Sequence, residues 1–178
     1  MKQSFKIAYG GIVCALSLAM MFMTGIFPFA EYALPAIAGT FLVALVIELG
    51  YRTSVIAYIA ISLLSALIVP NKEAVVMFIV FLGYYPILKG RLEQIKKRSL
   101  EWVMKLLLFN IAIVFAYYLV IQVLGMTEVL EDFNFMKYGL GVIWALGNVT
   151  FVIYDIALTR VISMFIQRIR PKIMKRLQ

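Results

Sequence analysis

Long apolar stretches alternate with short polar or turn-forming stretches along this chain. A helix needs about 20 mostly apolar residues to cross the roughly 30 Å of hydrocarbon in a bilayer. The apolar runs predict six such spans, of which the second and fourth are short. They cover about residues 7–27, 34–49, 54–70, 74–88, 102–126 and 136–159.

The connections between these runs carry residues that end helices. Pro28 and Pro35 bracket the first loop, and Gly50 closes the second span. The pair Pro70-Asn71 separates the third span from the fourth. The first apolar run follows two lysines, as in a signal peptide, but it is too long for one and has no convincing cleavage site. We therefore expect it to remain as the first span.

Composition agrees with the apolar pattern. Of the 178 residues, 64% are hydrophobic and 15% are charged, and the mean hydropathy is +0.98. These values lie well outside those of soluble domains. The sequence predicts an all-α integral membrane protein in which residues 1–178 form a single six-helix domain, with a basic tail at 160–178.

The basic residues predict how the spans are oriented. If both ends of the chain are cytoplasmic, fifteen of the seventeen lysines and arginines fall on the cytoplasmic side, and only Lys72 and Lys137 fall outside. Loops on the cytoplasmic side of a membrane are enriched in these residues. The basic tail adjoins a membrane span, which favours a solvated flank over a nucleic-acid site. We expect a multi-pass protein of a bacterial cytoplasmic membrane, embedded in the lipid bilayer.

Several chemistries are missing from the chain. It contains no histidine, which excludes zinc proteases and His-dependent serine hydrolases. It also has no phosphate-binding loop of the G-x-x-x-x-G-K-[ST] type, so energy from ATP has to come through a partner. We expect no enzymatic activity, no cofactor and no metal site.

The predicted outer loops are acidic and contain polar and aromatic side chains. Such groups at the rim of an apolar bundle suit the binding of a small polar or aromatic molecule. The alternative is that they are ordinary wetted loops with an interfacial aromatic belt. The candidate ligand-binding residues are Glu31, Lys72, Glu73, Tyr118, Gln122 and Asn134.

The first apolar run has small residues at regular spacing. Gly11, Ala15 and Ala19 recur every fourth position, so they form one smooth stripe on a helix. Small residues let helix backbones approach closely in lipid. The stripe predicts either packing inside the bundle or contact with a partner helix.

The whole arrangement resembles one family. Six spans, cytoplasmic termini, no nucleotide-binding motif and the A-x-x-x-A element "ALSLA" at 15–19 are similar to the substrate-binding S-components of energy-coupling factor (ECF) vitamin transporters. The resemblance implies that Ala15 and Ala19, extended by Gly11, dock onto a transmembrane coupling subunit bound to two ATPase subunits. It also implies that a vitamin-like nutrient binds on the outer side.

Two other functions remain open at this point. One is a membrane scaffold without transport activity, similar to the rod-shape-determining membrane proteins. The other is an autonomous ion-coupled carrier, for which few ionisable residues lie deep in the predicted spans. Neither the identity of a substrate nor the oligomeric state follows from the sequence.

Overall fold

The computed structural model describes residues 3–122, Gly125 and 139–171 of the chain. It divides the chain into two compact units, Met1–Glu131 and Asp132–Gln178. The described residues are almost entirely helical, as the apolar runs predict.

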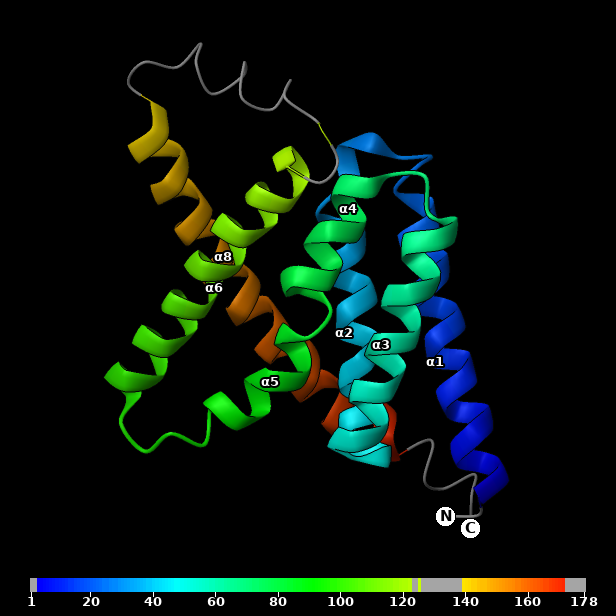
Figure 1. The fold of residues 1–178 in the computed structure, drawn as a ribbon. Helices are drawn as coiled ribbons and strands as arrows, with labels where there is room; N and C mark the ends of the chain where they lie inside the picture. The colour runs from blue at the N-terminus through cyan, green and yellow to red at the C-terminus, as the bar shows by residue number, and fades with distance from the viewer. Residues whose placement is uncertain (1–2, 123–124, 126–138, 172–178) are drawn as a thin grey trace. The chain divides into compact units, whose positions relative to one another are not determined.

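Three helices form the core of the first unit, and Figure 1 shows them side by side. They are α1 (Gln3–Met23), α2 (Ala33–Leu49) and α3 (Tyr51–Ile68). Met21, Leu42 and Ile61 are completely or almost completely buried where these helices meet. The Ser17 hydroxyl of α1 donates a 3.0 Å hydrogen bond to the Ala38 carbonyl of α2. A hydrogen bond from a side chain of α1 to the backbone of α2 therefore connects the two helices inside an apolar core.

The fourth span is a broken helix. It consists of α4 (Lys72–Met77), the π-helical segment η2 (Phe78–Leu82) and α5 (Tyr85–Leu92). The wide turn ends where the Gly83 N–H bonds to the Phe78 carbonyl at 2.8 Å. Pro86 follows in the first turn of α5, where its missing N–H costs nothing. The sequence predicts one short span at 74–88. The structure has a segment of 21 residues, Lys72–Leu92, in which α4 continues into η2 and a turn at 83–84 separates η2 from α5.

Close backbone contact holds this break in place. A Cβ added at Gly39 of α2 would collide with the Leu82 carbonyl oxygen. A Cβ at Gly83 would lie 2.8 Å from ring carbons of both Phe78 and Tyr58. The Tyr58 hydroxyl also donates a hydrogen bond to the Ile79 carbonyl within η2. Two glycines thus let α2 and α3 pack directly against the π-helical segment.

The remaining spans are long helices. The first unit ends its described part with α6 (Arg98–Gln122). The second unit contains α8 (Gly139–Met164), which continues into the π-helical segment η3 (Phe165–Ile169). The last helix therefore extends ten residues beyond its predicted end at 159. Arginine is a good helix former, so the charges that follow the apolar run do not stop the helix.

Hydrophobicity and length agree with a multi-pass membrane protein. In the described residues, five helical segments are long and apolar enough to cross a membrane, and Ala33–Leu49 is a shorter apolar helix. Large apolar side chains such as Ile7, Leu67 and Val114 are exposed on the helices. Such exposure is costly in water and favourable in lipid. This agrees with the all-helical membrane architecture expected from the sequence.

Candidate functional site

Four polar residues join two connections at one end of the first unit. Asn71 caps the start of α4 by accepting a 3.0 Å hydrogen bond from the Ala74 N–H. Its side-chain amide donates a 2.6 Å hydrogen bond to Glu31, in the connection between α1 and α2. Tyr32 in the same connection donates a 2.6 Å hydrogen bond to Glu73. We call Glu31, Tyr32, Asn71 and Glu73 the clasp.

The electrostatics of the clasp favour a neutral tyrosine. Partial burial raises the pKa of Tyr32, and the hydrogen bond to Glu73 raises it further because the carboxylate accepts the phenol proton. The charges of Glu73 and Glu31 act in the same direction. Tyr117 of α6 is also close enough to raise the Tyr32 pKa. The phenol therefore remains a hydrogen-bond donor well above neutral pH.

The lysine within this region turns away from both carboxylates. Lys72 Nζ donates hydrogen bonds of 2.9 and 3.0 Å to the carbonyls of Ala66 and Val69. These carbonyls lie in the last turn of α3 and just after it, where backbone acceptors have no helical partner and a cation is favourable. Glu31 and Glu73 therefore accept their hydrogen bonds from neutral donors. Such a pair of carboxylates can also accept bonds from the N–H or O–H groups of a small polar molecule.

The structure brings some of the predicted ligand-binding residues together and separates others. Glu31 and Glu73 both belong to the clasp, and Lys72 lies between Asn71 and Glu73. Tyr118 is 59% exposed on α6, and Gln122 is exposed at the end of the same helix. Asn134 lies outside the described residues.

Three neighbours of these candidates were not among the six predicted ligand-binding residues. Tyr32, Asn71 and Tyr117 all contact or influence the carboxylates. A sequence signal existed only for Asn71, which follows a proline and precedes a helix with Glu73 in its first turn, a pattern typical of an N-cap. Within the described residues, no group of three or more cysteine, aspartate or glutamate side chains could hold a metal ion.

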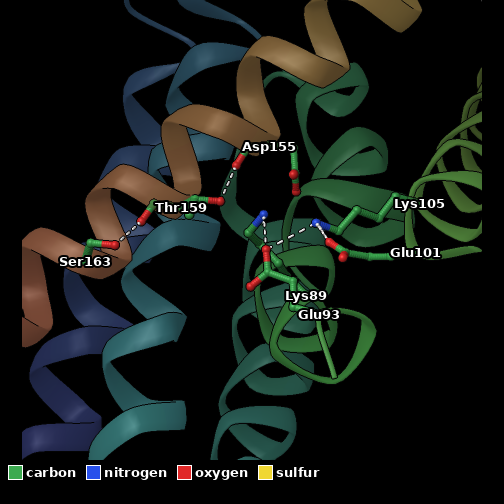
Figure 2. Close-up of polar contacts among 7 residues, drawn as sticks. All are labelled: Lys89, Glu93, Glu101, Lys105, Asp155, Thr159 and Ser163. Carbon is green, nitrogen blue, oxygen red and sulfur yellow. Dashed lines mark hydrogen bonds and ion pairs between the residues drawn. The ribbon is translucent and has the colours of Figure 1, made fainter. Parts of the chain in front are cut away.

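A second polar cluster joins α5 to α6 in the first unit. Lys89 Nζ lies 2.8 Å from Glu93, and Lys105 Nζ lies 3.1 Å from the same Glu93 oxygen. Lys105 also lies 2.8 Å from Glu101. Figure 2 shows these four side chains converging, and we call them the ionic cluster. Both lysines are almost completely buried, so sharing of carboxylates offsets the cost of removing their charges from water.

The small-residue stripe on α1 points away from the core of its unit. The buried face of α1 carries Val13, Ser17 and Met21, whereas Gly11, Ala15 and Ala19 are exposed. A Cβ added at Gly11 would meet no atom within 4 Å. The stripe therefore takes no part in the α1–α2–α3 core, and both predictions for it, packing elsewhere in the bundle and contact with a partner helix, stay predictions.

Polar side chains on α8 bond to their own helix. Thr159 donates to the Asp155 carbonyl at 3.0 Å, and Ser163 donates to the Thr159 carbonyl at 2.9 Å (Figure 2). Asn148 donates to the Trp144 carbonyl at 2.9 Å. Such bonds to the carbonyl one turn earlier give hydroxyl and amide groups an acceptor along an apolar helix.

Comparison with known proteins finds no matching family model, no matching curated protein and no matching solved structure.

Proposed function

We propose that this chain is a membrane-embedded substrate-binding subunit, similar to the S-components of ECF transporters. It captures a small nutrient at the end of the first unit that carries the clasp, and this end faces outward from a bacterial cell. A transmembrane coupling subunit with two ATPase subunits then drives delivery. Both termini are cytoplasmic, and the chain itself performs no chemistry.

One observation carries the proposal: the small-residue stripe of α1 is exposed. Apolar helices gain little from hydrophobic burial against one another in lipid, so close backbone packing over small residues is a main source of association. Gly11, Ala15 and Ala19 are a smooth strip on an outward face of α1. The neighbouring exposed side chains Ile12 and Leu16 are large. The small side chains thus allow the backbone of a second helix to approach α1 closely along this strip.

The clasp supports the proposal that a small nutrient binds at this end of the first unit. A nutrient needs polar groups at an accessible end of the bundle, and Glu31 and Glu73 are only partly buried. Tyr32 and Tyr117 add aromatic surface beside Glu73. Binding sites for small molecules combine apolar walls with a few polar groups of this kind.

The test combines two measurements on the double variant Ala15→Leu/Ala19→Leu. Added bulk on the stripe blocks close approach of a partner helix but leaves the core of the first unit untouched. We expect the purified variant to melt within about 2 °C of the original protein, because surface substitutions usually change stability by less than about 0.5 kcal/mol. Co-purification of ATPase subunits from the native host should be lost.

Two control variants make the result specific. Ala60→Leu adds the same bulk to an exposed position of α3 and should leave both melting and co-purification unchanged. Ala38→Leu adds it to a fully buried position and should lower the melting temperature. If the original protein brings down no ATPase subunits, the transport proposal fails, and a scaffold or an autonomous carrier becomes the better explanation.

A further inference from the structure

Exposed cations gather at one end of the first unit. The start of α1, the turn between α2 and α3, and the connection between α5 and α6 all lie at this end, because successive spans run in opposite directions (Figure 1). The clasp lies at the other end. We call the exposed cations of this end the basic rim. Its members are Lys6, Arg52, Arg91, Lys96, Lys97 and Arg98.

The ionic cluster occupies two of the carboxylates near this rim, Glu93 and Glu101. Glu93 and Glu101 are the acidic residues closest in sequence to Lys96, Lys97 and Arg98, and both already pair with Lys89 or Lys105. Arg91 instead stacks over the Tyr51 ring at 3.7 Å. Lys89 and Lys105 thus pair with Glu93 and Glu101, and the six rim cations outnumber Glu48, the acidic residue in the last turn of α2.

Large apolar side chains lie directly beside the rim cations. Ile7, which follows Lys6, is 70% exposed, and Ile56, one turn after Arg52, is 67% exposed. Val103 lies in the second turn of α6 after Arg98 and is 58% exposed. A molecule that satisfies both surfaces needs a negatively charged head and an apolar tail. An acidic soluble protein offers the charge but not the tail.

We propose that the basic rim is a docking surface for anionic phospholipids. The phosphate and other anionic headgroups contact Lys96, Lys97, Arg98 and the neighbouring cations, while the acyl chains cover the exposed apolar side chains. Each lysine or arginine near an anionic membrane surface strengthens binding about fivefold. Several cations on one rim therefore select phosphatidylglycerol strongly over a zwitterionic lipid with the same chains. This inference does not depend on the transport proposal.

The test uses native mass spectrometry of the purified full chain in detergent. Phosphatidylglycerol and phosphatidylcholine with identical acyl chains are added in equal amounts, and the bound ratio is measured. We expect the original protein to favour phosphatidylglycerol. In the triple variant Lys96→Gln/Lys97→Gln/Arg98→Gln, the bound ratio of phosphatidylglycerol to phosphatidylcholine should fall at least about tenfold. Added salt should weaken it as well.

Matched variants separate charge from fold. Lys72→Gln removes a cation at the opposite end and should keep the preference, as should Lys96→Arg/Lys97→Arg, which retains the charges. The single variants Lys96→Gln and Lys97→Gln should each lose part of it, which keeps the test decisive if the triple variant misfolds. Equal binding of the two lipids, an unchanged preference in the single and triple Gln variants, or displacement by millimolar glycerol phosphate would each overturn the proposal.

Discussion

The same side-chain type serves different purposes at different positions in this protein. Lys89 and Lys105 are buried and paired, Lys72 caps the end of α3, and Lys96 is exposed on the basic rim. When basic residues are counted to predict orientation, all of these lysines have the same weight. Their separate roles follow from which carboxylates and carbonyls the fold brings near each amine.

Tyr32 leads to a pH-dependent prediction. Its folded pKa is raised above the value near 10 of an unfolded tyrosine, so the folded state holds the phenol proton more tightly. The resulting stability is present below about pH 10 and is lost as the pH rises further. At pH 7 we expect Tyr32→Phe to cost about 0.5–1 kcal/mol through the lost hydrogen bond to Glu73.

Melting temperatures of the purified protein check this prediction. The difference in melting temperature between the original protein and the Tyr32→Phe variant should become smaller between pH 9 and pH 11. Tyr118→Phe, on an exposed position of α6, is the control and should melt like the original protein at pH 7. If this difference in melting temperature became larger as the pH rises, the folded state would stabilise the ionised form of Tyr32, contrary to the prediction.

The fourth span differs from its prediction in kind, because it is a broken helix. Hydropathy detects the apolar run at 74–88 but not the wide turn within it. Among the candidate spans of the described residues, this one has the largest buried share. Contacts with α2 and α3 stabilise the break, because the Tyr58 hydroxyl and the Gly39 backbone meet carbonyl groups of η2. π-helical segments occur often at functional sites.

Gly39→Ala tests how tightly this element is held. The added methyl group collides with the Leu82 carbonyl, so α2 and η2 have to separate, and the cost should be about 1–3 kcal/mol. Gly11→Ala is the matched control on α1, because its methyl group meets open space. We expect a melting temperature several degrees lower for Gly39→Ala and an unchanged or higher one for Gly11→Ala. Equal melting of the two variants would show that α2 and η2 are not in close contact.

Orientation concerns the protein as a whole. The fifteen-to-two split of basic residues predicts that residue 132 lies outside the cell and residue 97 inside. Asp132→Cys should therefore react with a membrane-impermeant thiol reagent in intact cells, whereas Lys97→Cys should react only after the membrane is opened. Both variants carry Cys14→Ser, which removes the one natural thiol. Labelling in the reverse order would invert the topology and place the clasp in the cytoplasm.

The sequence alone determined that the described residues are almost entirely helical and apolar, and roughly where along the chain the helices lie. Long apolar runs leave few alternatives in lipid, because a helix satisfies every backbone polar group within itself. For the same reason, the predicted spans at 7–27, 34–49 and 54–70 differ from α1, α2 and α3 mainly at their ends.

Only the tertiary structure decided which side chains meet. Glu31 and Asn71 are 40 residues apart, and Tyr32 and Glu73 are 41 apart, so no local pattern could pair them. The sequence also left open which face of α1 enters the α1–α2–α3 core, because small residues suit both a bundle interior and a partner contact. Packing of Val13, Ser17 and Met21 against α2 and α3 decided it, since one face of a helix can enter the core only by turning the other away.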